Sequence, residues 1–443
     1  MALEVRACRP EEQLAGLAPI FHYFGATPKP EYVERFSRIL PPERLHAAFE
    51  DGKAVAGAGA FPFRMTVPGA QIPAAGVTTV GVLPTHRRRG VLTAMMRAQL
   101  DDVRERGEKI GVLWASEDMI YGRYGYGMAS FAGALDLARE RAHFALPSEP
   151  VGRMRLVSLE DALGAFPVIY DRVAPETPGM FSRTRDWWEV RRLSDPPERR
   201  DGGGEHVRAL LEMDGEPAGY AIYRIHMRFE GGVSAGFVNV LESAGVTPLA
   251  VREIWRFLLG IDLVASIRAD LLPIDHSLLL LLAEPRRMRF RIRDGLWVRL
   301  VDLGAALSSR SYAADGAVVF EVADAFCPWN AGSWKLEGGK ATRTRERADM
   351  RLDVSALGSV YLGGFTFAQL ARSHRIRAIR SNCSPSSYWA RRRNHSPWTR
   401  APQAPNRFIL DARCRLPEPE RCMVWGVGSW LNCLHRSQCR IRR

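Results

Sequence analysis

The sequence lacks a long apolar run, and it has few cysteines outside its last seventy residues. The longest uninterrupted apolar stretch, residues 278–283, is far too short to cross a bilayer. Residues 1–10 contain no apolar core of the kind that a secretory signal needs. Only two of the seven cysteines precede residue 373, which is typical of a protein kept in a reducing compartment. We therefore expect no membrane span and a cytoplasmic location, although export without a standard signal would leave no trace in the sequence.

The composition is that of an ordinary globular protein. The chain has 443 residues, of which 46% are apolar and 25% charged, and this excludes disorder, collagen and coiled coil. Its length suggests two to four domains, each able to bury its own core without a disulfide or a metal. The net charge of +13 resides at one end, because residues 373–443 hold fifteen Arg and only three acids. The rest of the chain is nearly neutral, so we expect no nucleic-acid partner.

The first segment has the pattern of an α/β domain. Residues 45–50 and 54–61 form strand-like runs around Asp51-Gly52, a dipeptide that permits a tight hairpin turn. A strand is predicted over residues 76–83, a helix over 91–104 and another strand over 110–115.

The pattern then recurs and finally changes. Residues 209–223 parallel residues 47–61. A strand predicted over 236–242 and a helix predicted over 248–259 then repeat the order strand, loop and helix without an arginine-glycine junction. From residue 296 the alternation of strands with Asp-Gly and Gly-Gly turns predicts a third domain of α+β type. We therefore predict domains at 1–147, 148–295 and 296–372, followed by a tail at 373–443.

The junction before the helix of the first segment has the chemistry of a phosphate site. Arg88-Arg89-Gly90 stands between a buried strand and a helix. The free N–H groups and the positive dipole end of such a helix attract a pyrophosphate, and the arginines can add charge-assisted hydrogen bonds. The alternative interpretation is a solvated basic turn, and the position directly after a buried strand favours the phosphate site.

Four segments carry a resemblance to a known family. Residues 80–92 (VGVLPTHRRRGVL) resemble the acetyl-CoA motif of the GNAT N-acetyltransferases, with Arg87 and Gly90 in place and Leu92 departing from the usual small residue. Residues 115–127 (ASEDMIYGRYGYG) resemble the enhanced intracellular survival (Eis) branch of that family. Residues 325–332 (AFCPWNAG) and 358–364 are similar to the same branch.

The resemblance implies an α/β (α+β) architecture of tandem GNAT folds followed by a sterol-carrier-protein-like domain, assembled as a homohexamer. It implies acetyl-CoA as co-substrate and a primary amine as acceptor, of aminoglycoside, polyamine or lysine type. Tyr121 matches the general acid that protonates the CoA thiolate. The residues expected to bind the cofactor are Val80, Gly81, Val82, Arg88, Arg89, Gly90, Val91, Leu92, Thr93, Ser116 and Glu117. The alternative is a non-catalytic protein that binds an apolar ligand in its third domain.

The tail departs from this pattern. In the resembling enzymes the terminal carboxylate follows the third domain closely and serves as general base, whereas residues 373–443 are rich in Arg and contain five Cys. The leading hypothesis is a frameshift that has replaced the native terminus and impaired turnover. The alternatives are a basic arm for RNA or membranes and, ranked last, a zinc site, because the cysteines form no C-x-x-C pair.

Overall fold

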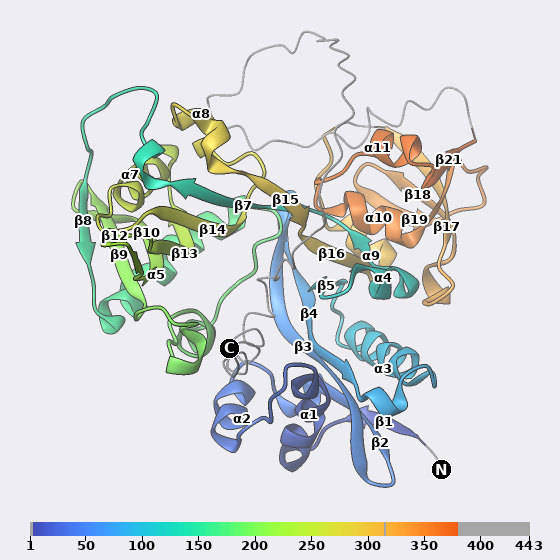
Figure 1. Ribbon diagram of the computed structural model, residues 1–443. Helices are drawn as coiled ribbons and strands as arrows, with labels where there is room; N and C mark the ends of the chain where they lie inside the picture. Colours follow the sequence, from blue (N-terminus) through green and yellow to red (C-terminus); the bar gives the residue numbers. More distant parts are fainter. Residues whose placement is uncertain (1–2, 314–315, 380–443) are drawn as a thin grey trace.

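The computed structural model describes residues 3–313 and 316–379, which form three large sheets and one two-stranded sheet (Figure 1). The first sheet has the strand order β1-β2-β3-β4-β5-β16-β6. Its strands are β1 (Glu4–Ala7), β2 (Leu45–Glu50), β3 (Lys53–Val67), β4 (Ala70–Val82), β5 (Ile110–Trp114), β16 (Leu296–Leu300) and β6 (Gly127–Met128). The helices of this domain are α1 (Gln13–Tyr23), α2 (Pro30–Ser37), α3 (Val91–Glu105) and α4 (Asp118–Tyr121).

The two faces of the first sheet are covered by different helices. Alternate residues of a strand face opposite sides, so Phe61 packs with α1 and α2 while Ala58 packs beneath α3. The predicted hairpin is present, with Asp51 and Gly52 both at positive φ in the β2–β3 turn. The predicted helix at 91–104 and the strand at 110–115 are confirmed to within one residue, whereas β3 ends six residues later and β4 begins six residues earlier than predicted.

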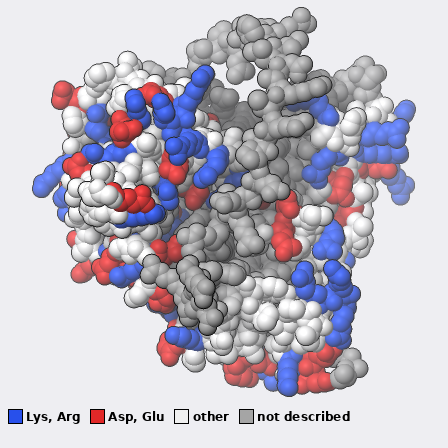
Figure 2. All heavy atoms as spheres, in the orientation of Figure 1, with Lys and Arg blue, Asp and Glu red and all other residues white. Residues whose placement is uncertain are grey.

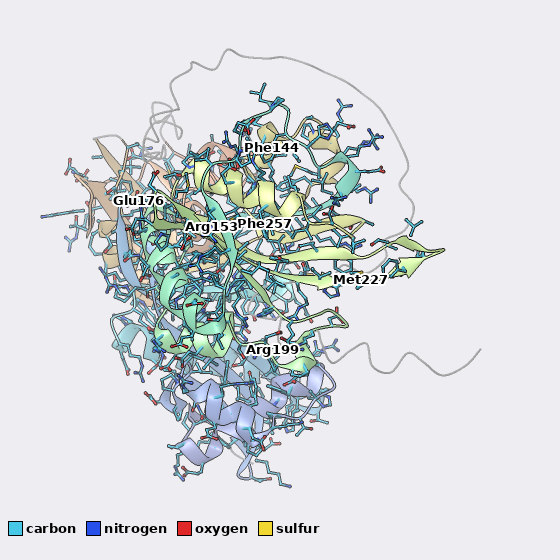
Figure 3. All side chains as sticks on the ribbon, turned by 90° about the vertical axis from the view of Figure 1, so that its left-hand side faces the viewer. Phe144, Arg153, Glu176, Arg199, Met227 and Phe257 are labelled. Carbon is cyan, nitrogen blue, oxygen red and sulfur yellow. The ribbon has the colours of Figure 1, made fainter. Side chains whose placement is uncertain are left out.

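The second sheet repeats the topology of the first, in the order β8-β9-β10-β13-β14-β7-β15. Its strands are β8 (Arg153–Leu156), β9 (Val207–Met213), β10 (Glu216–His226), β13 (Phe237–Gly245), β14 (Ser266–Leu272), β7 (Phe131–Ala138) and β15 (Arg291–Asp294). The helices around it are α5 (Leu159–Val173), α6 (Arg185–Trp187), α7 (Pro248–Leu259) and α8 (Leu278–Leu281). A small hairpin, β11 (Phe229–Glu230) and β12 (Val233–Ser234), projects from it near Met227 (Figure 3).

The first two sheets exchange strands across the predicted domain boundaries. Strand β7 precedes residue 147 in the sequence but pairs with β14 in the second sheet. Strand β16 follows residue 295 but fills the place between β5 and β6 in the first sheet. Local patterns mark where a strand lies in the chain but not which sheet it enters. The predicted boundaries therefore do not separate the sheets.

The third sheet has the order β19-β18-β17-β20-β21. Its strands are β17 (Ala317–Ala323), β18 (Gly332–Glu337), β19 (Lys340–Arg343), β20 (Met350–Asp353) and β21 (Ile376–Ala378), with helices α9 (Leu303–Ser308), α10 (Val354–Tyr361) and α11 (Phe367–Arg372). Helix α10 lies so close to the first sheet that a Cβ on Gly127 would stand 1.9 Å from the Ser355 carbonyl oxygen. Strand β21 pairs with β20 beyond the predicted start of the tail at residue 373. The remaining tail predictions concern residues 380–443, which lie outside the described residues.

The second domain retains the fold of the repeat but fills the place where its sheet opens. Strand β13 has a bulge at Leu241, and its pairing with β14 ends at Val240. Arg192 donates to the Leu241 carbonyl, and Glu242 accepts from Arg183 at 2.7 and 2.8 Å. Helix α7 then begins only three residues after β13 ends, and the Thr247 side chain caps it. As expected from the missing arginine-glycine junction, no phosphate loop separates this strand and helix.

The buried Glu242 predicts an acid-sensitive second domain. Burial alone would raise its pKa, but the charges of Arg183 and Arg192 outweigh burial and hold the pKa at about 2, below its ordinary 4.5. The ion pairs therefore contribute their full stability above pH 4.5, and about 3 kcal/mol is lost as pH falls toward 2. Urea unfolding midpoints measured between pH 7 and 3 should fall more steeply for the wild type than for Glu242→Gln. Parallel curves would contradict the assignment.

Among the described residues, no helix is both long and apolar enough to cross a bilayer.

Candidate active site

The first sheet opens into a fork between β4 and β5. The two parallel strands pair only from Ala74 with Ile110 to Gly76 with Val112, after which β4 continues alone beside β3. A bulge sets Thr79 and Val80 where β3 offers only Ala58, and Thr79 has a positive φ of 52°. A bulge bends a strand and takes its groups out of the ladder. The fork therefore leaves an open strand edge beside Val80.

The loop that leads from the fork into α3 presents unpaired backbone donors. Arg88 and Gly90 both have positive φ, and no side chain caps the helix at Gly90. Within the described residues, the N–H groups of residues 88–93 have no hydrogen-bond partner. A fifteen-residue helix adds its positive dipole end at the same place. This arrangement suits an anionic group such as a pyrophosphate.

The three arginines of this loop have different surroundings. Arg89 is held by Glu50 at 2.6 Å, and Glu50 also bonds His86 at 2.8 Å. These hydrogen bonds, that from His86 foremost, lower the pKa of Glu50. Arg87 and Arg88 are exposed and form no ion pair among the described residues. Basic side chains gather over this part of the first domain in Figure 2. Of the three arginines, Arg89 is therefore the one that is already paired with a carboxylate.

Tyr121 lies at the inner end of the fork. It is the last residue of α4 and packs in one cluster with Val77 of β4, Leu113 of β5 and Met96 of α3. Burial, reinforced by the charge of Glu117, raises the pKa of Tyr121 to about 12. Its hydroxyl has no hydrogen-bond partner among the described residues and is not among their fully enclosed polar atoms. A neutral phenol therefore remains available to a ligand.

The neighbouring tyrosines are more constrained. The Tyr126 hydroxyl is fully enclosed, and burial raises its pKa well above the ordinary value. Tyr124 meets the ring of Phe326 edge to face at 5.0 Å, and its hydroxyl lies 3.5 Å from the Thr93 hydroxyl. Ser116 and Glu117 are exposed between β5 and α4.

Two predicted cofactor residues have a further structural role. A Cβ on Gly81 would lie 2.8 Å from the backbone of Ile20, so this glycine lets α1 approach the sheet. The Val82 carbonyl accepts a hydrogen bond from the Tyr23 hydroxyl. The structure thus brings α1 to the fork, and no motif in the sequence signals Tyr23 or Glu50. A hollow of about 400 Å³, lined in part by Arg35, Leu163 and Arg208, contains none of the predicted site residues.

Comparison with known proteins gives the family. Residues 5–129 and 179–300 each match the acetyltransferase (GNAT) domain, and residues 303–391 match the sterol carrier protein domain. An uncharacterized N-acetyltransferase of Streptomyces coelicolor is 42% identical over 392 residues, covering 86% of this chain and 95% of that protein. The N-acetyltransferase Eis of Mycobacterium tuberculosis is 35% identical over 325 residues, covering 71% of this chain and 77% of Eis.

A solved structure agrees with the sequence relatives. The crystal structure of Eis1 from Mycobacterium abscessus superimposes with a TM-score of 0.76 at 32% identity, covering 87% of this chain and 97% of that one. The predicted order of two GNAT domains and a sterol-carrier-like domain is confirmed. The sterol-carrier match continues to residue 391, beyond residue 372, where the sequence interpretation ended the family pattern. The chain therefore belongs to the Eis-like GNAT N-acetyltransferases, and it is an acyltransferase.

Proposed function

We propose that the chain transfers the acetyl group of acetyl-CoA to a primary amine at the fork between β4 and β5. The observation that carries this proposal is the row of unpaired N–H groups at residues 88–93, directly beside an open strand edge. The row would hold the pyrophosphate, with Arg87 and Arg88 adding charge. The bulged edge at Val80 would pair with the amide groups of the pantetheine arm. The second sheet differs at the corresponding opening between β13 and β14, because Arg183 and Arg192 fill it with hydrogen bonds to Glu242 and to the Leu241 carbonyl.

Tyr121 would act as the proton donor. The cationic acceptor first releases one proton to water, and its neutral nitrogen then attacks the thioester carbonyl. The carbon–sulfur bond breaks, and Tyr121 gives its proton to the departing sulfur. The proton that the nitrogen loses on forming the amide returns to the phenol through solvent. A phenol can fill this role because it is protonated at neutral pH when the thiolate forms. The pKa of about 12 makes Tyr121 a weak acid, so it donates to the basic thiolate and not to the intact thioester.

The acceptor would be a cationic amine of aminoglycoside, polyamine or lysine type. The exposed acids Glu117 and Asp118 stand next to Tyr121 in the chain and favour a positively charged acceptor. The family resemblance also supports a homohexamer, which sedimentation of the purified chain would test. The predicted cytoplasmic location stays a proposal, and it accords with the free thiols of Cys8 and Cys327. The alternative of an apolar-ligand carrier would leave the open loop at residues 88–93 without a role.

Titration calorimetry of acetyl-CoA into the purified chain, followed by thiol release with a panel of amines, tests the proposal. Binding with release supports the acetyltransferase. Binding without release would place a defect at the general base, as the frameshift hypothesis expects. The absence of binding would contradict the proposal and favour the carrier.

Arg88→Gln is expected to weaken acetyl-CoA binding about tenfold, because a charge-assisted bond to phosphate is lost. The matched control is Arg228→Gln, an exposed arginine on the second domain whose ion pair is with Glu230. The dissociation constant of each variant is measured by the same titration. Equal constants for Arg88→Gln and the control would remove Arg88 from the phosphate site.

A further inference from the structure

A loop of the third domain lies along the flank of α3. This loop, residues 324–330, lies between β17 and β18 and ends in a short helical turn, Pro328–Asn330. The Arg97 guanidinium of α3 lies 3.9 Å from the centroid of the Phe326 ring, and that of Arg104 lies 4.4 Å from the Trp329 ring. Between them, Cys327 is fully buried in a cluster with Leu100 and Val103 of α3. The loop thus contacts α3 along two successive turns of the helix.

Phe326 also touches the segment that carries the proposed acid. Its ring meets Tyr124 edge to face, three residues after Tyr121. Tyr124 in turn lies 3.5 Å from Thr93 in the first turn of α3. One side chain of the third domain therefore contacts both parts of the candidate site, the helix that presents the free N–H groups and the turn that follows Tyr121.

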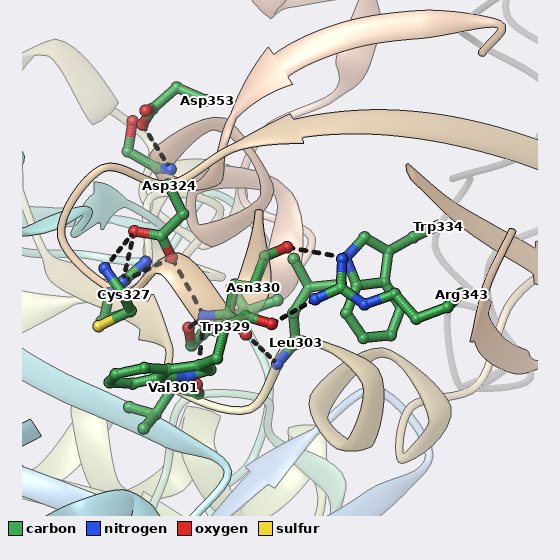
Figure 4. A network of polar contacts seen from close by, with 12 residues as sticks. Val301, Leu303, Asp324, Cys327, Trp329, Asn330, Trp334, Arg343 and Asp353 are labelled. Carbon is green, nitrogen blue, oxygen red and sulfur yellow. Dashed lines mark hydrogen bonds and ion pairs between the residues drawn. The ribbon is translucent and has the colours of Figure 1, made fainter. Parts of the chain in front are cut away.

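A network of hydrogen bonds and ion pairs holds the loop, as Figure 4 shows. Asp324 accepts hydrogen bonds from the Cys327 N–H at 2.8 Å and from the Asn330 side chain at 3.1 Å. Asn330 donates to the Leu300 carbonyl at the end of β16 and accepts from the Leu303 N–H. Arg299 of β16 binds Asp324 at 2.7 Å. Since β16 belongs to the first sheet, the loop is fastened to the domain that it contacts.

We propose that the third domain takes part in acetyl transfer through the 324–330 loop, with Phe326 as a positioning residue for α3 and the Tyr121 turn. The inference rests on the proposed function, because it assigns a role at that same site. Catalysis demands that reacting groups be held closely, and a displacement of about 1 Å can cost a large factor in rate. A rigid ring that contacts two separate parts of a site is suited to that task. Phe326 itself touches no reacting atom in this scheme.

The test compares two identical substitutions in the same domain. Phe326→Leu removes the ring contacts with Arg97 and Tyr124, whereas Phe320→Leu removes a core ring that stacks on Phe367 of the same domain. We expect kcat/KM for acetyl-CoA to fall about tenfold in Phe326→Leu, with KM raised and kcat lowered. Phe326→Tyr keeps the ring and should restore both constants. Phe320→Leu, assayed below its melting temperature, should lower thermal stability and leave both constants unchanged.

The outcomes separate this inference from the proposed function. Wild-type binding and turnover with unchanged constants in Phe326→Leu would overturn the positioning role alone. A wild type that does not bind acetyl-CoA would overturn the proposed function, and the inference with it. Should Phe326→Leu fail to fold, Arg97→Met supplies the decision, because it removes the charge over the ring and keeps the aliphatic stem. We expect it to raise KM for acetyl-CoA about threefold, and an unchanged KM would refute the inference.

Discussion

Replacing Tyr121 by Phe is expected to lower kcat by a factor of about 10² to 10⁴ while KM for acetyl-CoA stays near its wild-type value. The hydroxyl makes no hydrogen bond to a described residue, so its removal breaks no contact that holds the site together. The ring remains in its cluster between β4 and β5, and the fork keeps its shape. The loss should therefore fall on proton transfer to the thiolate. Steady-state kinetics with a fixed amine measures it.

The matched control is Tyr223→Phe, a buried tyrosine of the second sheet that packs against Phe257. It should leave kcat unchanged. The pH profile gives a second check, because a pKa raised to about 12 keeps the acid protonated across the working range. At pH values up to about 11, kcat should therefore show no decrease caused by deprotonation of Tyr121. An alkaline limb near pH 8 that disappears in Tyr121→Phe would show that burial does not hold the proton as described.

Arg299→Met is expected to lower the free energy of unfolding by about 3–5 kcal/mol, the cost of leaving a buried carboxylate without its partner. Arg299 is completely buried on β16 and binds both oxygens of Asp324, at 2.7 and 2.8 Å. Asp324 also accepts from the Cys327 N–H and the Asn330 side chain, so the hydrogen bonds that hold the 324–330 loop depend in part on this ion pair. Urea unfolding of the wild type and the variant measures the change.

Arg38→Met is the control for this substitution. Arg38 pairs with Asp186 and Glu189 at the surface, where ion pairs contribute about 0–1 kcal/mol. In addition, Asp324→Asn combined with Arg299→Met should cost less than the sum of the two single changes, because the second change removes the stranded charge. Additive losses would mean that the two side chains stabilise the protein independently.

Local patterns predicted the parts of the fold that neighbouring residues determine. The Asp51-Gly52 turn needs positive φ, and the helix at residues 91–105 follows from apolar spacing. Helix α7 has the predicted bounds, Pro248–Leu259, because Thr247 and Pro248 mark its start. The repeat was visible for the same reason, since both copies carry the same hairpin signal. The strand exchange was not visible, because a strand's sequence does not specify a partner some 190 residues away.

The candidate site divides in the same way. Gly90 and the arginines beside it could be found because a helix start and a strand end are local features. The different surroundings of the arginines could not be predicted, because Glu50, which binds Arg89, comes from the β2–β3 hairpin. The contact between the Tyr23 hydroxyl of α1 and the Val82 carbonyl could not be predicted for the same reason. Phe326 belongs to a motif that the family resemblance identified. Its contact with Arg97 of α3 required the third domain to be placed in space.

The exchange of β7 and β16 has a consequence for the folding of the protein during its synthesis on the ribosome. Strand β5, complete at residue 114, acquires its neighbour on one side only when residues 296–300 have been synthesised. Until then the nascent first sheet has an unpaired edge at β5, and such an edge can pair with a strand of another chain. The second sheet, by contrast, has β7 at hand before the rest of its strands emerge. The N-terminal GNAT domain is thus completed after the second one. If translation terminated between residues 114 and 296, the released chain would have an incomplete first sheet and would be prone to aggregate.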